Sequence, residues 1–522
     1  MLALLNNTRT FVPAFIEEQF KTPPLPKNPI TLHQMGLKIS VGSKTNTPPV
    51  VMNNVTIIFY GFIFNLFELC YYINRSTTDT TNEELIIHLY RQYGIEQTLQ
   101  MIDGTFTFLL LDNKPQSNEY VLYIVRDSYG MEPLFVMHPT SCPDDSFEME
   151  PIIAFSTELS LLNGFYKKLQ ISDSDKKKKK KKTAFTEYTV QPFSPGTYST
   201  YTFQTNSFSN WMSTHNKTYS PNYIRYSYLS FNSIMYSSTP QYSESEIVLN
   251  LQRYLIRSTQ KWCSHIYSKK PIPTCAVALS GGISSSIVCG LIQQYHITNG
   301  LPPLKTYSVA YENDADHLSD PYYWKLVANY LKTDHTEHLI TESEYEDLLP
   351  EVMSIWQSPE KEYMRAAVSE FWLGKKMAED GIQYMINGNG AHELFGGFIN
   401  EFPIQDCIEF DKECREQIGN HYLHEGLQTN QLIRYWNIIP YSPFLDRSLV
   451  QYYFTVPPQI RAIMSVDNDI ACEKYWLRIA FSHDYYRNSC DESMLPDEVL
   501  WRALSYKKEY DFEEEDALEV DP

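Results

Sequence analysis

The chain has 522 residues, which is enough for two or three domains with buried cores. Its 63 acidic residues outnumber its 43 Lys and Arg residues, and the net charge of −20 argues against nucleic acid as a main partner. Nine cysteines without a CxxC pair fit neither a disulfide framework nor a structural zinc site, so a reducing cytoplasmic location is expected.

The N-terminal part reads as an α+β domain. Its start lacks the charged and apolar regions of a signal peptide. The apolar stretch at 55–73 contains Gly61, Asn65 and Glu68, so we expect a buried strand and a second apolar element there, and no membrane span. Further residues are expected to form strands at 105–111, 120–126 and 152–155 and one helix at 82–93.

A change in composition separates this part from the rest of the chain. The run from Lys176 to Lys182 predicts a solvated insertion at 173–183, although a nuclear address or an anion-binding patch is a less favoured alternative. Residues 198–243 are rich in Tyr, Ser, Thr and Asn and predict a poorly packed connector. We therefore expect a first domain at 1–200, a connector at 201–243, a second domain at 244–510 and an acidic tail at 511–522.

The second domain alternates helices with apolar strands. Helical patterns occupy 244–261, 322–331 and 366–380, and strand patterns occupy 274–279, 304–310 and 384–387. This alternation predicts an α/β fold with a doubly wound parallel sheet, in which ligands bind beyond the carboxyl ends of the strands.

The segment after the first of these strands has the features of an anion-binding loop. Residues 280–286 read SGGISSS and lead into an apolar helix. A glycine turn before a helix N-terminus directs several backbone N–H groups and the positive end of the helix dipole to one point. The segment matches neither GxGxxG nor GxxxxGK[ST], and taken alone it fits an ordinary strand, turn and serine-capped helix equally well.

With the rest of the domain, the segment resembles the pyrophosphate loop SGGxDSS of the N-type ATP pyrophosphatases. Further motifs follow in the order found in glutamine-hydrolysing asparagine synthetases. They are 306–309 (TYSV), 386–397 (INGNGAHELFGG), 443–446 (PFLD), 473–478 (EKYWLR) and 495–502 (LPDEVLWR). Residues 60–65, 103–108, 125–134, 154–158 and 195–196 resemble, more faintly, the class II amidotransferase (Ntn-like) half of that family.

The resemblance implies ATP-dependent amidation of aspartate through an aspartyl-adenylate, with ATP, aspartate and ammonia or glutamine as small-molecule partners and with a possible homodimer. It implies no membrane or nucleic-acid partner. Arg365 and Glu393 occupy conserved positions of the family's motifs and are weak catalytic candidates. The expected nucleotide contacts are Leu279, Ser280, Gly281, Gly282, Ser285, Ser286, Val309, Asn387 and Gly388.

The glutaminase half departs from the family at every position that handles glutamine. The nucleophilic cysteine at position two is Leu2 here, and no counterpart of the glutamine-binding Arg lies near Leu37. The oxyanion Asn is Tyr60, the substrate-holding Glu is Phe62, and the substrate Asp aligns with Asn82. We therefore expect a degenerate domain that acts as a structural partner, and ammonia as the more plausible nitrogen source.

The synthetase half departs in its metal and catalytic positions. The two magnesium-binding aspartates align with Ser284 and His392, which are poor ligands for a hard dication, so Mg²⁺ is doubtful and no metal ligand is assigned. Asn389 replaces a Glu of the ammonia step, and Leu504 replaces a Lys unless Lys507 or Lys508 takes its place.

Two interpretations stay open: an ammonia-dependent asparagine synthetase, and a catalytically impaired member that binds nucleotide or acts as a structural or regulatory subunit. A ligase of the β-lactam synthetase type is disfavoured, because it needs the same loop aspartate and a lysine.

Overall fold

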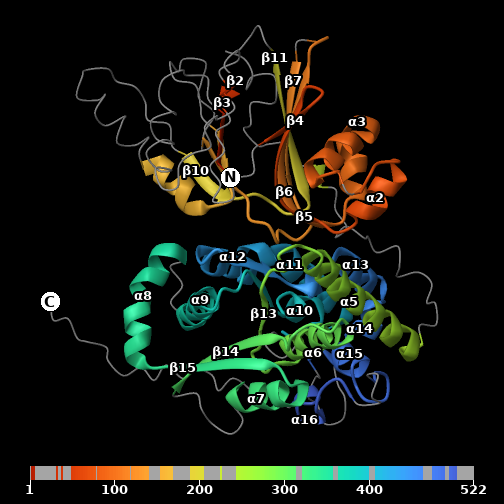
Figure 1. Cartoon of the computed structure of the whole chain (residues 1–522), viewed down its shortest axis with the longest axis vertical. Coiled ribbons are helices and arrows are strands. Elements are labelled where there is room, and N and C mark those ends of the chain that lie inside the picture. Colours follow the sequence, from red (N-terminus) through yellow and green to blue (C-terminus); the bar gives the residue numbers. More distant parts are fainter. Residues whose placement is uncertain are drawn as a thin grey trace, which may run out of the picture.

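The computed structural model describes most of the chain in two parts that lie one above the other in Figure 1. The lysine-rich insertion, the acidic tail, Leu504, Lys507 and Lys508 lie outside the described residues. The described ranges are 49–77, 79–117, 119–139, 153–167, 188–204, 243–312, 320–356, 363–398, 406–462, 473–487 and 493–502, with short strands at 2–5, 31–32, 37–38 and 224–225.

The N-terminal domain is built from antiparallel sheets. One has the order β12 (Ile224–Arg225), β11 (Thr197–Gln204), β7 (Glu119–Arg126), β6 (Gly104–Lys114), β5 (Val55–Ile63) and β4 (Val50–Met52). The other has the order β1 (Leu2–Leu5), β9 (Ile153–Ser156), β8 (Phe135–Pro139) and β10 (Tyr188–Pro192). A small pair is formed by β2 (Thr31–Leu32) and β3 (Leu37–Lys38). Helices α2 (Leu66–Tyr72) and α3 (Asn82–Met101) lie beside the larger sheet (Figure 1).

The strands expected around 55–60, 105–111, 120–126 and 152–155 are confirmed as β5, β6, β7 and β9, and the helix expected at 82–93 is α3. Thr81 and Glu84 form a capping box that fixes the start of α3, and the helix continues past Gly94 to Met101. The expectation of a poorly packed segment from residue 198 onward is wrong for residues 198–204, because they pair with β7 as part of β11. Tyr and Thr suit a half-buried strand, and Tyr198 is buried with its hydroxyl donating to Glu96 at 2.9 Å.

The C-terminal domain contains the expected parallel α/β sheet. Its strand order is β15 (Asp334–Ile340), β14 (Lys305–Tyr311), β13 (Cys275–Ala278), β16 (Tyr384–Ile386) and β17 (Ile439–Tyr441), and all pairs are parallel. Its helices are α5 (Glu244–Tyr267), α6 (Ile283–Thr298), α7 (Asp320–Leu331), α8 (Glu342–Trp356), α9 (Met364–Glu379), α10 (Ala391–Leu394), α11 (Cys407–Asn420), α12 (Glu425–Tyr435), α13 (Arg447–Thr455), α14 (Pro458–Arg461), α15 (Tyr475–Ala480) and α16 (Asp497–Leu500).

Alternate side chains of the strands enter two cores on opposite faces of this sheet. Val277 and Ile386 pack with residues of α5, α6, α7 and α13. Ala276 and Met385 pack with residues of α9 and α12. The double covering explains the near-continuous apolar sequences of β13 and β16.

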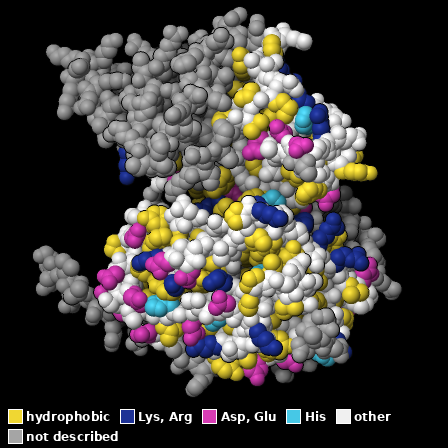
Figure 2. All heavy atoms as spheres, viewed as in Figure 1, with side chains coloured by type: hydrophobic (Ala, Val, Ile, Leu, Met, Phe, Trp, Pro, Cys, Tyr) yellow, Lys and Arg dark blue, Asp and Glu magenta, His cyan; other side chains and the backbone are white. Residues whose placement is uncertain are grey.

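The strand order reverses between β13 and β16. From β13 the chain adds β14 and then β15 toward one edge, and it later returns to add β16 and β17 on the other side. The loops after β13 and β16 therefore diverge at the carboxyl edge of the sheet, where doubly wound proteins bind ligands. Among the described residues, no helix combines the length and the apolar character needed to cross a bilayer. On the face shown in Figure 2, acidic and basic side chains are interspersed over the described surface of the C-terminal domain.

Candidate functional site

The loop after β13 is held in a tight turn against α7. Gly281 has φ +80°, and a Cβ at this position would lie 2.9 Å from the backbone nitrogen of Trp324. Only glycine satisfies both conditions without strain. Leu279 is buried at the start of the loop, where its N–H donates to the Tyr307 carbonyl at 2.9 Å. The loop is therefore anchored to β14 at one end and to α7 at its tip.

The serines of this loop form different hydrogen bonds. Ser280 Oγ and Ser285 Oγ lie 3.0 Å apart, and Ser285 Oγ accepts the Ser280 N–H at 3.2 Å. Ser286 Oγ donates to the Gly282 carbonyl at 2.8 Å. These bonds close the loop on itself and leave the first N–H groups of α6 without partners inside the helix. A helix N-terminus of this kind can bind an anion.

The loop after β16 lies directly against this N-terminus. A Cβ on Gly388 would lie 2.9 Å from the Ser285 backbone nitrogen and 3.0 Å from Ser284 Cβ, so a side chain does not fit there. Asn387 is buried, its N–H donates to the Tyr441 carbonyl at 3.0 Å, and its Oδ1 accepts the Asn389 N–H. The structure thus brings 280–286 and 387–388, which are about 100 residues apart in sequence, into one surface at the point where the strand order reverses.

Two other predicted residues lie along β14 and beside it. Val309 is part of β14, and Ser308 Oγ of the same strand donates to the Leu279 carbonyl. Arg365 is in the first turn of α9, and its guanidinium lies over the Tyr311 ring, 4.1 Å from the centroid. The Tyr311 hydroxyl donates to the Arg365 carbonyl at 2.8 Å. Arg365 is therefore held near the end of β14 by both its side chain and its backbone.

Several motif residues have structural roles. Asp446 caps α13 by accepting the Ser448 and Leu449 N–H groups, and it forms an ion pair with Lys261. Lys261 also pairs with Asp103 of the N-terminal domain at 2.6 Å. The PFLD motif therefore fastens the two domains together.

The C-terminal motif contacts the helix that supports the β13 loop. Arg502 pairs with Asp320 at 2.9 Å and lies over the Tyr323 ring at 4.0 Å. Arg478 donates to the Glu473 and Leu500 carbonyls. These arginines tie the C-terminal segment to α7 and to α15.

The positions that align with magnesium ligands do not fit a hard dication. Ser284 Oγ is buried and has no hydrogen-bond partner in the described part of the chain, and a neutral hydroxyl is a weak ligand. His392 lies in α10 with its ring 6.0 Å from the Phe398 ring, and imidazole is a softer donor than Mg²⁺ prefers. The side chains at these two positions therefore do not fit Mg²⁺.

Glu393 of α10 forms a buried pair with His421. Its Oε1 lies 2.6 Å from His421 Nδ1, and both residues are about 95% or more buried. Burial opposes ionisation of Glu393, but the neighbouring imidazole outweighs burial and lowers the pKa of this carboxyl below its usual value. His421 is in a short helical turn before α12 and carries no sequence signal, because it is one isolated histidine.

Sequence reasoning also missed Glu370 of α9. Its carboxylate accepts the Thr429 hydroxyl at 2.6 Å and the Gln428 amide at 3.1 Å. The same Thr429 hydroxyl accepts the Asn389 amide at 3.1 Å. Burial raises the pKa of Glu370 to about 7, although Thr429 and Gln428 act in the opposite direction. A proton-accepting carboxylate thus lies one hydroxyl away from Asn389, where the family was expected to have its own Glu.

In the N-terminal domain, Tyr60 takes part in a contact between the domains. Its hydroxyl accepts Arg434 Nη1 of α12 at 3.1 Å, and the Arg434 guanidinium also pairs with the buried Glu132 at 2.9 Å. Burial raises the pKa of Tyr60, so the hydroxyl stays neutral. The Tyr60 hydroxyl therefore takes part in holding the two domains together.

Phe62 and Phe64 continue this contact along β5. The Phe62 ring lies 5.0 Å from the His265 ring and 4.4 Å from the Lys269 ammonium of the segment after α5. The Phe64 ring lies 5.8 Å from the Tyr441 ring. Asn82, which aligns with a substrate Asp, begins α3. The strand that would line a glutamine site is therefore used to dock the C-terminal domain.

A pocket of about 270 Å³ is left between the domains, lined by Tyr60, Thr157, Glu158, Arg434 and neighbouring residues.

Comparisons with known proteins find two family models in the chain. Residues 34–147 match the family model of a glutamine amidotransferase domain, and residues 272–431 match that of asparagine synthase. The glutamine-hydrolyzing asparagine synthetase of Cricetulus griseus is 28% identical over 426 residues, which are 80% of this chain and 65% of that protein. The enzyme of Homo sapiens is 26% identical over 451 residues, which are 85% of this chain and 70% of that protein.

Solved structures give weaker matches. The NAD+ synthetase of Burkholderia pseudomallei is 11% identical with a TM-score of 0.22, over 42% of this chain and 95% of that chain. The NMN synthetase of Francisella tularensis is 15% identical with a TM-score of 0.21, over 38% of this chain and 94% of that chain. The chain spans about two thirds of the length of the hamster protein. From its two matched domains and its curated relatives, the chain belongs to the asparagine synthetase family as a divergent member.

Proposed function

We propose that this protein is an ATP-dependent amide ligase that converts aspartate to asparagine with free ammonia, and that its N-terminal domain has no glutaminase activity. The observation that carries the proposal is the contact of Gly388 with the first turn of α6, at the reversal of the strand order. That contact joins the two loops that would hold the nucleotide. It rests on backbone geometry and is unaffected by the substitutions at Ser284 and His392.

In this proposal the phosphates of ATP lie on the N-terminus of α6. The backbone N–H groups of its first turn and the positive end of the helix dipole stabilise the negative charge of the leaving pyrophosphate. Leu279, Val309 and Asn387 border the adenosine side, and Ser280, Gly281, Gly282, Ser285 and Ser286 shape the phosphate side. The aspartate side-chain carboxylate attacks the α-phosphorus, and the bond from that phosphorus to the bridging oxygen breaks.

Ammonia then attacks the acyl carbon and AMP leaves with the bonding electrons. The nitrogen must lose a proton in this step, and Glu370 is the proposed acceptor through Thr429. A carboxylate with a pKa near 7 is well matched to that task at neutral pH. Arg365 and Glu393 are proposed to contact the substrate side, and Lys474, whose side chain interacts electrostatically with Glu393, is a further candidate.

A second candidate function is that of a catalytically impaired, nucleotide-binding or structural member of the family. It is favoured by the donor set at Ser284 and His392, which does not fit the metal that the family is expected to use. The docked β5 strand is compatible with both candidates, because a domain without glutaminase activity can still support its neighbour.

The two candidates predict different fates for the oxygen atoms of the aspartate side-chain carboxylate. Aspartate labelled with ¹⁸O in its side-chain carboxylate, incubated with ATP and ammonium, transfers one ¹⁸O to AMP if an aspartyl-adenylate forms. We expect AMP heavier by one label and asparagine that retains the other label. Unlabelled AMP, or no AMP above a protein-free control, would refute the ligase and leave the impaired member.

A further inference from the structure

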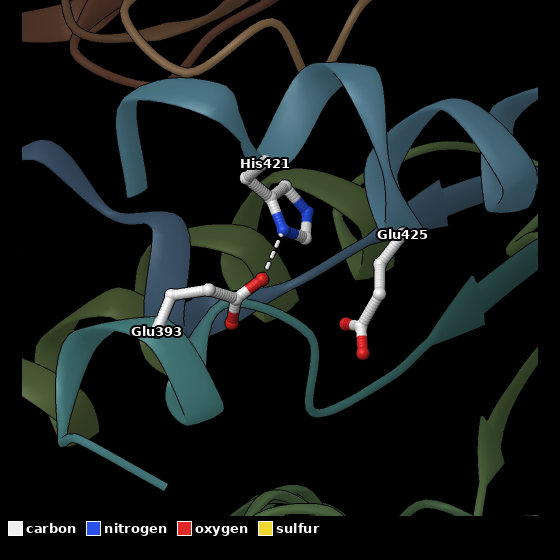
Figure 3. Close-up of side chains that lie close together, drawn as sticks. All are labelled: Glu393, His421 and Glu425. Carbon is white, nitrogen blue, oxygen red and sulfur yellow. Dashed lines mark hydrogen bonds and ion pairs between the residues drawn. The ribbon is translucent and has the colours of Figure 1, made fainter. Parts of the chain in front are cut away.

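Glu393, His421 and Glu425 form a group of potential metal ligands outside the loop site. Within the described residues, one ligand atom from each lies within 4.8 Å of the other two. The three side chains come from α10, the short turn after α11 and the start of α12, and they face a common space in Figure 3. Elements distant in sequence thus deliver two carboxylates and one imidazole to one point.

One oxygen of the Glu393 carboxylate lacks a hydrogen bond to any described residue, which indicates that this group is incomplete. Glu393 is 5% exposed, and its Oε2 has no hydrogen-bond partner among the residues that the structure describes, although Oε1 is bonded to His421. A buried carboxylate oxygen without a partner costs free energy, because it has lost its hydration without a replacement. A cation bound between the three side chains supplies the missing interaction.

The imidazole is held in the orientation that this role requires. A Cβ on Gly426 would lie 3.0 Å from His421 Nε2, so the absence of a side chain at Gly426 makes room for the ring. This position of the ring directs Nδ1 toward Glu393. A metal ion would replace the proton between Nδ1 and Oε1.

The charges around the group include an opposing one. Lys474 is coupled electrostatically to both Glu393 and Glu425, and burial lowers its pKa. Glu425 also interacts electrostatically with Glu370, so a third carboxylate lies nearby. Glu473, Arg478 and His392 complete the titratable groups that act on Lys474 or Glu393. A bound metal ion would therefore compete with Lys474, Arg478 and the His421 proton for these carboxylates.

We propose that Glu393, His421 and Glu425 bind a divalent first-row transition metal ion. Two carboxylate oxygens and one imidazole nitrogen suit Mn²⁺, Fe²⁺ or Zn²⁺ better than Mg²⁺, which prefers oxygen ligands alone. The group shares Glu393 with the proposed substrate contacts, but Mn²⁺ binding is measured without ATP or aspartate, so it does not depend on whether the protein is a ligase. Its failure and the failure of the proposed function are therefore distinguishable.

Mn²⁺ is the probe, because its binding to the full chain can be followed by loss of the electron paramagnetic resonance signal of the free ion, and because it has little affinity for thiols. After chelation and removal of the chelator, we expect the wild-type protein to bind one Mn²⁺ per chain. Glu425→Gln should weaken binding at least about tenfold. Glu425 is exposed, so this variant keeps the fold.

Three further variants sharpen the test. Glu416→Gln on α11 removes an exposed carboxylate outside the group and should bind like the wild type. Lys474→Met should bind more tightly, because the competing ammonium is lost. His421→Gln should abolish binding, with circular dichroism reporting whether the variant folds. No Mn²⁺ bound by the wild type, or equal affinity in wild type, Glu425→Gln and Glu416→Gln, would overturn the proposal.

Discussion

Replacing Gly388 by Ala tests whether the contact between the β16 loop and α6 builds the nucleotide site. The added Cβ would lie 2.9 Å from the Ser285 backbone nitrogen and 3.0 Å from Ser284 Cβ, closer than the carbon and nitrogen atoms tolerate. The neighbouring atoms are backbone, or a Cβ fixed to it, so one of the two loops must move. Overpacking of this kind costs about 1–3 kcal/mol of stability.

The same displacement should also weaken nucleotide binding. We expect Gly388→Ala to fold with a lowered free energy of unfolding in denaturant and to lose at least about tenfold in ATP affinity by isothermal titration, since a tenfold change needs only about 1.4 kcal/mol. Gly164→Ala is the matched control, because a Cβ there would meet no atom within 4 Å. ATP affinity that is unchanged in Gly388→Ala while stability falls would refute the reasoning, because the contact would then serve packing alone.

Three other outcomes are expected. Arg434→Met should lower the free energy of unfolding, measured in urea, by about 3–5 kcal/mol, because Glu132 stays buried without its cation. Adding Glu132→Gln should restore most of the loss, and no recovery in the double variant would contradict this explanation. The contribution of Glu370 to stability should fall by up to about 3 kcal/mol as pH rises from about 4.5 to about 7, because unfolded Glu370 releases its proton at the lower pH and folded Glu370 at the higher one. Glu370→Gln should reduce the slope of stability against pH by this contribution and leave that of Glu132, whose pKa burial also raises to about 7, and an unchanged slope would refute the assignment. Ser284→Asp with His392→Asp should increase magnesium-dependent ATP binding more than either single change, and titrations that do not differ across the series would show that these positions do not face a nucleotide.

The architecture of the C-terminal domain follows from its sequence because both faces of its sheet are covered. Val277 and Ala276 enter different cores, so β13 reads as a continuous apolar run that predicts a parallel strand. The contact of Gly388 with Ser285 could be expected only in outline, because sequence gives the order of the strands but not the distance between two loops. Residues 334–340 (DHTEHLI) were missed as β15, since an edge strand with charged residues has no apolar run to reveal it.

The residues around Glu370 and His421 could not be found from sequence for a different reason. Glu370 reaches Asn389 through Thr429, which is 40 residues further along the chain. His421 becomes a partner of Glu393 only when α11 and α12 pack beside α10. Neither pair has a fixed spacing, so no local pattern marks it. Substitutions such as Tyr60 were visible as losses, whereas their use in docking the domains needed the position of Arg434.

Aspartate-dependent release of pyrophosphate from ATP tests the central claim most directly. The measurement compares the purified full chain supplied with ammonium against the same protein supplied with glutamine alone, each with and without aspartate. The proposed function predicts release that requires aspartate, continues over many turnovers with ammonium, and does not rise above background with glutamine. Release with glutamine equal to that with ammonium would contradict the proposed loss of glutaminase activity, and no aspartate-dependent release under either condition would contradict the ligase itself.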